Sequence, residues 1–304
     1  MRSAVQRLGR LTALDALAAV AGQAHRYVRL DVFTEVPLQG NALAVFPGAA
    51  GLSGANMQRI ARELNLSESV FVLAAREAGD FRLRIFTPTR ELAFAGHPVL
   101  GAAFLAATAL GSDAVALETG AGLVEIELRR DAARVSFGWM AQPIPTWHAY
   151  ERADELLRAL GVSRSGLPIE AYTNGPVHVY VELDSEAAVA GLRPDFGALG
   201  GLGEVGVSCF AGAGRAWKTR MFAPALGVAE DPATGSAAGP LAVHLARHAR
   251  IGFGEEIEIS QGVEIGRPSV LHGRADGARE HIERVAVGGA AVITGCGELR
   301  LPAE

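Results

Sequence analysis

One pattern occurs twice in this chain and constrains its fold more than any other feature. Residues 84–88 (RIFTP) are echoed by residues 220–224 (RMFAP). In each copy a strand-like piece ends at a proline, and a polar or acidic loop then leads to small residues that open an Ala-rich apolar run. A proline interrupts a strand, and a helix that is apolar all round is a buried one. The pattern therefore predicts a strand, a turn and a buried helix, once in each half of the chain.

The starts of these two predicted helices are candidate binding sites. A helix start offers N–H groups without intrahelical partners and the positive end of the helix dipole, and Gly or Ser there lets an anion approach the backbone. The first start carries Gly96 and His97, and the second carries Gly235 and Ser236 after Asp231. For either copy alone, turn glycines and a capping histidine are the alternative. The duplication favours two facing helix starts that bracket a small acid.

Composition and charge exclude several classes of partner. The chain has 304 residues, 49% of them hydrophobic, which is enough for two domains with cores. Its net charge of -5 is spread without blocks of one sign, so we expect no nucleic-acid partner. No apolar run reaches the ~18 residues of a membrane span. The spacing of the two cysteines, Cys209 and Cys296, fits neither a metal knuckle nor a disulfide framework, which favours a cytoplasmic protein.

We expect an N-terminal extension over residues 1–24, an N-terminal lobe over 25–141 and a C-terminal lobe over 142–304. The extension has a basic start and an apolar middle, like a secretory signal, but Asp15 interrupts the apolar run. An added amphipathic helix or a start codon placed too far upstream is therefore favoured over export. The lobes divide at the linker-like residues 142–145 (QPIP). The last strand is a candidate for pairing back with the N-terminal lobe.

Hydrophobic periodicity predicts the remaining elements. A helix is expected from Gly54, with Ser53 as its cap, and others over 153–160 and near Ala187. Because each half is strand-rich and has one dominant apolar helix, we expect each of those helices inside a curved sheet, in an α+β fold. The expected strands are 27–33, 42–46, 70–73, 81–86, 115–118, 122–129, 134–137, 178–183, 205–210 and 216–222, with others near Ile257, Val263, Val285 and Val292.

Glu68 is the candidate acid–base residue. It follows Ser67 at a predicted helix-to-strand junction, where functional residues commonly lie. A solvated surface acid is the alternative. An ordinary Glu has a pKa near ~4.3, so at neutral pH its side chain would be ionised and able to take a proton.

Two other motifs are weaker. Residues 201–206 match the dinucleotide-binding fingerprint GxGxxG, but a predicted strand over 207–210 follows where a helix is required. His244 and His248 lie four apart on a predicted helix, the spacing of two metal ligands. No third ligand is obvious, so we expect no metal and assign His248 to the dipole at the helix C-terminus.

Several strings of this sequence together match one known family. They are 38–41 (LQGN), 44–46 (AVF), 65–68 (NLSE), 91–98 (ELAFAGHP), 142–147 (QPIPTW) and 230–240 (EDPATGSAAGP). On these strings the chain resembles, from His25 to about Leu301, the PhzF family of phenazine-biosynthesis isomerases. The Glu68, Gly-His-Pro and Asp-x-x-Thr-Gly-Ser motifs are family-wide, whereas 142–147 and 209–215 (CFAGAGR) are narrower signals that favour phenazine synthesis.

The resemblance implies a diaminopimelate-epimerase-like fold, with two pseudo-symmetric lobes. Each lobe would be a barrel-like, mostly antiparallel sheet around a central helix, with the site in the cleft between them. It also implies a homodimer that isomerises trans-2,3-dihydro-3-hydroxyanthranilate without a cofactor. In that reaction a carboxylate takes a proton from C3, C1 receives a proton, and the resulting enol relaxes to the amino ketone.

The resemblance also assigns roles to individual residues. Glu68 occupies the position of the catalytic carboxylate, and His97 and Asp231 match residues that contact the polar groups of the substrate, so these three are the expected catalytic residues. Epimerases of this fold use a cysteine pair, but neither loop carries one, which disfavours racemisation by two thiols. The residues expected to bind the substrate, chiefly near its carboxylate, are Ser67, Gly96, Gly235 and Ser236.

Two alternative functions stay open. One is a PhzF-like isomerase of another small amino or hydroxy acid. The other is a non-catalytic protein of the same fold that binds a small acid. The presence of Glu68, His97 and Asp231 together argues against the non-catalytic alternative.

Overall fold

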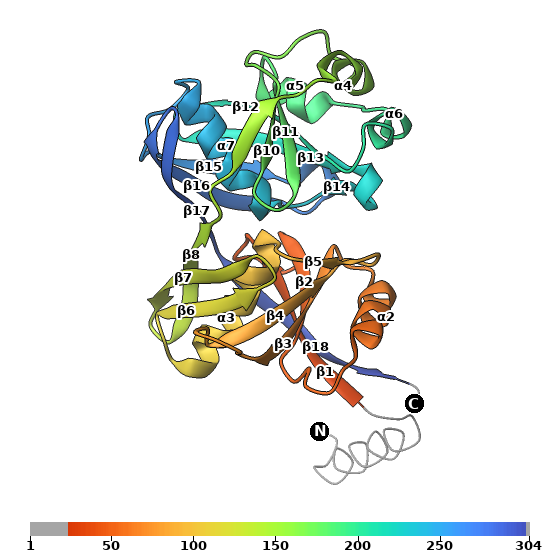
Figure 1. The fold of residues 1–304 in the computed structure, drawn as a ribbon, viewed down its shortest axis with the longest axis vertical. Coiled ribbons are helices and arrows are strands. Elements are labelled where there is room, and N and C mark those ends of the chain that lie inside the picture. Colours follow the sequence, from red (N-terminus) through yellow and green to blue (C-terminus); the bar gives the residue numbers. More distant parts are fainter. Residues whose placement is uncertain (1–23, 302–304) are drawn as a thin grey trace, which may run out of the picture.

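Two lobes with the same strand plan lie one above the other in the computed structural model, which describes residues 24–301 (Figure 1). None of the helices in this described part is long and apolar enough to span a membrane. The N-terminal extension expected over residues 1–24 lies outside the described residues, apart from Ala24, with which the first strand begins.

The N-terminal lobe is built on eight consecutive strands and the last strand of the chain, which returns to it. The last strand pairs antiparallel with the first, so the two ends of the described chain lie together in one sheet. These strands are β1 (Ala24–Val32), β2 (Asn41–Phe46), β3 (Glu68–Ala74), β4 (Phe81–Phe86), β5 (Glu91–Leu92), β6 (Ala114–Thr119), β7 (Gly122–Asp131), β8 (Arg134–Gln142) and β18 (Ala291–Arg300).

The C-terminal lobe contains the strands between them. Gln142 ends β8 and Thr146 begins β9, so the chain passes from one lobe to the other over three residues. The strands are β9 (Thr146–Ala149), β10 (Glu170–Thr173), β11 (Val177–Glu182), β12 (Gly206–Ala213), β13 (Ala216–Ala223), β14 (Val228–Asp231), β15 (Glu256–Gln261), β16 (Ser269–Ala278) and β17 (His281–Gly289).

The pairing order is the same in both lobes. In the N-terminal lobe β18, β1 and β2 are antiparallel, β2 and β3 parallel, β3 and β4 antiparallel, β4 and β6 parallel, and β6, β7 and β8 antiparallel. In the C-terminal lobe β9, β10 and β11 are antiparallel, β11 and β12 parallel, β12 and β13 antiparallel, β13 and β15 parallel, and β15, β16 and β17 antiparallel. The short strands β5 and β14 pair with β4 and β13. An antiparallel β8–β17 pair joins the lobes.

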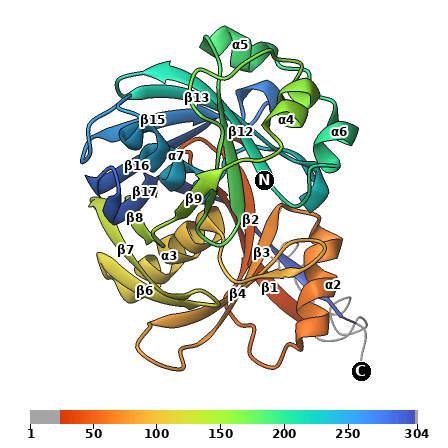
Figure 2. The ribbon, with the colours of Figure 1, turned by 45° about the horizontal axis from the view of Figure 1, so that its top comes forward.

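Each lobe encloses one apolar helix, as the duplicated pattern predicts. These are α3 (Gly96–Leu110) and α7 (Gly235–Arg247), and Figure 2 shows them with the strands of their lobes around them. Every residue of α7 is buried, as are most residues of α3. A helix with apolar residues on all sides avoids water only when a sheet curves around it. The α+β class and the two-lobed architecture are confirmed.

The smaller helices connect strands along the chain. Ser53 caps α2 (Gly54–Leu64) as predicted, with its side chain accepting from the Asn56 N–H at 3.2 Å. Asn65 ends that helix in the left-handed conformation, at φ 49°, and turns the chain toward Glu68. The others are α4 (Ala153–Leu160), α5 (Glu186–Gly191), α6 (Phe196–Gly200) and the short 3-10 helices η1 (Pro224–Leu226) and η2 (Val263–Ile265).

One predicted strand is wrong. The apolar residues near Val263 form η2, because Gly262 and Gly266 on either side adopt positive φ of 78° and 71° and close a turn. The strand lies further on, as β16. The rejection of the dinucleotide-binding fingerprint is confirmed, since strand β12 begins at Gly206 where a helix would be required.

Candidate active site

The N-terminal turns of α3 and α7 touch each other. A Cβ atom on Gly96 would lie 2.8 Å from the Ser236 backbone nitrogen, and one on Gly235 would lie 3.2 Å from the Gly96 Cα. Only glycine permits so close an approach of two backbones. The two helix starts therefore face each other at the junction of the lobes.

A cavity of ≈ 280 Å³ lies at this contact and is lined by residues of both lobes. Its lining combines polar groups with apolar side chains, among them those of Leu92, Phe94 and Met221. A small cavity with an apolar wall and a few convergent polar groups suits a small organic acid. It contains every site residue that the sequence predicts, namely Ser67, Glu68, Gly96, His97, Asp231, Gly235 and Ser236.

Glu68 opens β3, and its side chain is 16% exposed. Its Oε2 atom lies 3.4 Å from His97 Nε2, yet neither atom has a hydrogen-bond partner among the described residues. Burial, and then the nearby charge of Asp231, raise the pKa of Glu68 to about 8. The expectation of an ordinary, ionised Glu at neutral pH is therefore wrong, because the lobes enclose this carboxyl group beside a second acid.

His97 lies in the first turn of α3 and is 4% exposed. Burial lowers its pKa to about 3, so the imidazole is neutral at neutral pH. Glu68 and His97 together thus form a largely uncharged pair of polar groups without partners. Buried polar atoms are nearly always hydrogen-bonded, so such a pair in a cavity is suited to contact a ligand.

Asp231 ends β14 and is held by groups from both lobes. Its carboxylate accepts hydrogen bonds from Asn41 Nδ2 at 3.0 Å, Thr234 Oγ1 at 2.6 Å and Ser67 Oγ at 3.4 Å. Burial raises the pKa of Asp231 to about 6, although these hydrogen bonds oppose the shift. Because Asn41 and Ser67 belong to the N-terminal lobe, this carboxylate connects the two lobes at the cavity.

Three polar side chains that surround the start of α7 were not predicted from the sequence. Gln142 Nε2 donates to the Gly235 carbonyl at 2.8 Å, and Asn174 Nδ2 donates to the Ser236 carbonyl at 2.9 Å. His178 Nε2 lies 3.0 Å from Ser236 Oγ. Gln142 belongs to a string that matches the PhzF family, but its place in a linker-like segment gives no sign of this contact. Asn174 and His178 lie 62 and 58 residues from Ser236 in the chain, and no local pattern marks them.

The cysteines lie away from the cavity. Cys209 is buried in β12 and Cys296 is exposed on β18, and both thiols are free. Neither lines the cavity at the helix starts. The two facing turns therefore carry no thiol pair for two-base racemisation.

His244 and His248 have a third neighbour that the sequence did not reveal, Glu170 of β10. One donor atom from each of the three lies within 4.8 Å of the others. However, Glu170 Oε2 also accepts from Arg247 Nη1 at 2.7 Å and from the Tyr172 hydroxyl at 2.8 Å. Although burial opposes it, these hydrogen bonds and those from the two imidazoles lower the pKa of Glu170. A cation here would be repelled by the guanidinium, so the group fits a hydrogen-bonded network better than a metal centre.

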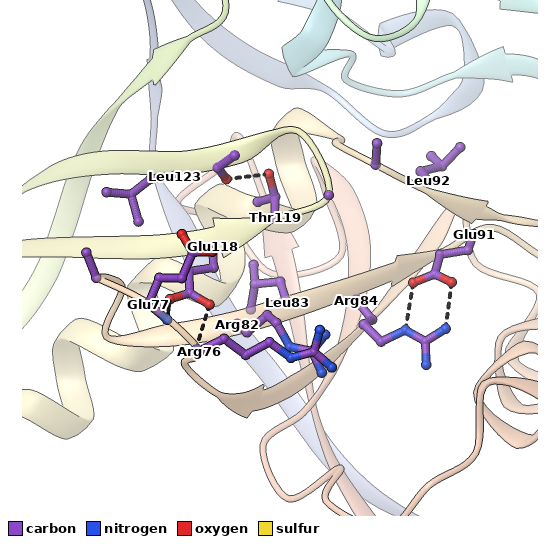
Figure 3. A pocket seen from close by; sticks show the side chains of 14 residues that line it. Arg76, Glu77, Arg82, Leu83, Arg84, Glu91, Leu92, Glu118, Thr119 and Leu123 are labelled. Carbon is purple, nitrogen blue, oxygen red and sulfur yellow. Dashed lines mark hydrogen bonds and ion pairs between the residues drawn. The ribbon is translucent and has the colours of Figure 1, made fainter.

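A larger hollow, of ≈ 680 Å³, lies beside β4 and the β6–β7 turn (Figure 3). Two of its three carboxylates, those of Glu91 and Glu118, are already engaged by the protein. Glu91 accepts two bonds from Arg84, at 2.7 and 2.6 Å, and Glu118 accepts backbone N–H groups from the 76–79 turn. Arg82 Nε is the one buried side-chain atom of this hollow without a hydrogen bond among the described residues. The smaller cavity is therefore the better candidate, since it combines an acid and an imidazole, both without partners, with two helix starts.

Comparison with known proteins finds similar sequences over most of the chain. The family model of the phenazine biosynthesis-like proteins (PhzC-PhzF) matches residues 30–297. The trans-2,3-dihydro-3-hydroxyanthranilate isomerase of Pseudomonas aeruginosa is 56% identical over 265 residues, which cover 87% of this chain and 95% of that protein.

Two solved structures have the same fold. The Bacillus anthracis phenazine biosynthesis protein of the PhzF family has a TM-score of 0.80 at 24% identity, covering 92% of this chain and 100% of the other. The hydroxyproline epimerase of Agrobacterium vitis has a TM-score of 0.62 at 12% identity, covering 92% of each chain. The similarity extends across both lobes and places the fold in the epimerase-like class.

Proposed function

This chain belongs to the phenazine biosynthesis-like (PhzC-PhzF) family, and on that basis we propose that it is a trans-2,3-dihydro-3-hydroxyanthranilate isomerase in which Glu68 carries the proton. One observation carries the proposal for the site. Glu68 Oε2 and His97 Nε2 are buried 3.4 Å apart, without hydrogen-bond partners among the described residues, in a cavity between two helix starts. An acid and a neutral imidazole so placed are suited to a bound ligand that exchanges a proton.

The chemistry of the substrate fits a single carboxylate. The C3 proton is allylic to the conjugated diene, so the charge that develops on its removal spreads into the diene and can be stabilised by facing hydrogen-bond donors. A raised pKa makes the ionised form of Glu68 a stronger base than an ordinary carboxylate, and its conjugate acid can return the proton at C1. This scheme calls for neither a metal nor a nicotinamide.

The remaining residues hold the substrate in this proposal. The facing turns at Gly96, Gly235 and Ser236 would receive its carboxylate, because helix starts attract anions. His97 and Asp231 would contact its other polar groups, with Ser67 positioned against Asp231 by the 3.4 Å hydrogen bond. We include a homodimer and a cytoplasmic location in the proposal, with no nucleic-acid partner.

The test is turnover of trans-2,3-dihydro-3-hydroxyanthranilate by the purified protein without added cofactor, followed by the loss of substrate absorbance. Glu68→Gln should lower the rate by roughly a hundredfold to ten-thousandfold, since it removes the proton carrier but keeps the shape. Glu63→Gln is the matched control, because Glu63 is an exposed acid of the preceding helix. A near-normal rate for Glu68→Gln would remove Glu68 from this role.

The same assay separates the alternatives. Absence of turnover by the wild type would overturn the substrate assignment and favour another small amino or hydroxy acid. Binding of such acids without turnover of any of them would support the non-catalytic alternative. Light scattering of the purified protein in solution tests the homodimer.

A further inference from the structure

The first turn of α7 lacks one of its own hydrogen bonds. In a regular helix the Ser236 carbonyl would accept from the backbone N–H four residues later, but that residue is Pro240, which has no N–H. Asn174, a residue that is 5% exposed, instead donates from its Nδ2 to this carbonyl at 2.9 Å. Asn174 therefore supplies the donor that the helix cannot.

The neighbouring carbonyls are also held from outside the helix. Gln142 donates to the Gly235 carbonyl at 2.8 Å, and the Tyr180 hydroxyl donates to the Ala237 carbonyl at 2.7 Å. Three successive carbonyls of this turn thus contact side chains from the lobe junction and from β11 and the turn before it. The orientation of the turn is set by these contacts as well as by the helix itself.

The Ser236 side chain is held by His178, which is 3% exposed. Burial lowers the pKa of His178 to about 4, so its ring is neutral and carries a single N–H. His178 Nδ1 is buried and has no partner among the described residues. A buried N–H without an acceptor is rarer than an unused acceptor, so the proton is assigned to Nε2, which donates to Ser236 Oγ. The serine hydroxyl hydrogen is then free to point into the cavity.

We propose that Asn174 and His178 are positioning residues that preset Ser236 as a hydrogen-bond donor to the carboxylate of the bound acid. Asn174 fixes the backbone of Ser236, and His178 fixes the orientation of its hydroxyl group. The proposal rests on the proposed function only in placing a small acid at the two helix starts. It does not depend on the proton step.

The decisive test uses anthranilate as the probe and 2-aminobenzamide as its uncharged match, with binding measured by calorimetry. Asn174→Ala should weaken anthranilate binding about tenfold, because it leaves the Ser236 carbonyl buried without a donor and releases the turn. The amide, which has no carboxylate, should bind Asn174→Ala as it binds the wild type. Adding Pro240→Ala should restore anthranilate binding, because an alanine at this position has the backbone N–H that the Ser236 carbonyl lacks.

Two results would overturn the role of Asn174. One is wild-type affinity for anthranilate in Asn174→Ala. The other is a double variant, Asn174→Ala with Pro240→Ala, that folds but does not recover anthranilate binding. Circular dichroism and thermal unfolding check the fold. If Asn174→Ala does not fold, the double variant is compared with Pro240→Ala alone, and the proposal requires equal affinities of these two.

His178 is tested by a conservative pair. His178→Gln keeps an amide N–H that can donate to Ser236 Oγ and should retain the preference for anthranilate over the amide, whereas His178→Leu should lose most of it. Equal preference in the two variants would contradict the assignment. None of these measurements requires turnover, so the roles of Asn174 and His178 can be tested even if the isomerase assay fails.

Discussion

The two copies of the repeated unit keep the same ion pair but bury it differently. In the N-terminal lobe Arg84 contacts Glu91 at 2.6 Å, with side chains 26% and 42% exposed. In the C-terminal lobe Arg220 contacts Glu230 at 2.7 Å, with side chains only 7% and 8% exposed. Arg220 Nη1 also donates to the Leu192 carbonyl at 2.9 Å, after the end of α5. The motif specifies the pair, and the packing of each lobe decides how much that pair contributes to stability.

The lobes also divide the chemistry of the site. Strand β12 corresponds to β3 in the pairing order, but it begins with Gly206 where β3 begins with Glu68. A Cβ atom on Gly206 would lie 2.8 Å from His178 Nδ1, so that place is taken by an imidazole of the adjacent strand. Acid–base chemistry is therefore expected from the N-terminal lobe, whereas our proposal assigns contacts with the substrate to Ser236 and Asp231 of the C-terminal lobe.

The largest expected effect is the loss of unfolding free energy when the buried ion pair is broken, compared with the exposed one. Glu230→Gln should lower the free energy of unfolding by about 3–5 kcal/mol, because it leaves the Arg220 charge buried without its partner. Glu91→Gln, the matched change in the exposed copy, should cost about 0–1 kcal/mol. Urea unfolding of both variants measures the difference. Equal losses would show that burial does not distinguish the two copies.

The two glycines at the contact between the helix starts should also differ in how well they tolerate a side chain. A Cβ atom on Gly96 would meet backbone atoms of Gly235 and Ser236 at 2.8 Å, whereas one on Gly235 would first meet Phe33 Cζ, at 2.9 Å. A side chain can move aside more easily than a backbone, so Gly96→Ala should be the more damaging change, by about 1–3 kcal/mol of unfolding free energy. Gly48→Ala is the control, since nothing lies within 4 Å of its added Cβ. A larger loss for Gly235→Ala would reverse the comparison.

The smallest expected effect is the change of kcat/KM with each pH unit. If Glu68 must be ionised to take the proton, kcat/KM should rise about tenfold per pH unit up to the pKa of about 8. Asp231→Asn removes the neighbouring negative charge, so it should move this rising limb to lower pH. The pH profiles of the two proteins provide the measurement. An unchanged limb in Asp231→Asn would mean that the two lobes do not interact electrostatically at the cavity.

Stability supplies an independent check on that pKa. The folded-state pKa of Glu68 is raised, so its stabilising contribution is full below its ordinary value of 4.5 and is lost as the pH rises through about 8. Relative to Glu68→Gln, the wild type should therefore lose up to about 1.4 kcal/mol of unfolding free energy per pH unit in this window. A difference that does not vary with pH would rule out the raised pKa.

The family resemblance and most helices and strands could be predicted from the sequence because their signals are local. The helix starts at Gly96 and Gly235, the cap at Ser53 and the junction before Glu68 all depend on residues a few positions apart. The error at Val263 arose where two glycines outweighed an apolar pattern. The strands β5, β9, β10 and β14 were not predicted, because two to four residues are too few to show a period. Asn174 and His178 could not be predicted either, because they act on a turn that lies about sixty residues away in the chain.

By itself the sequence determined that two strand–turn–helix units would form and that Glu68, His97 and Asp231 were the candidates for chemistry. Only the tertiary structure decided that the helix starts touch, that Glu68 lies 3.4 Å from His97 and that its pKa rises to about 8. The physical reason is that periodicity and capping act over a few residues, whereas desolvation and charge repulsion depend on which distant residues the fold encloses together.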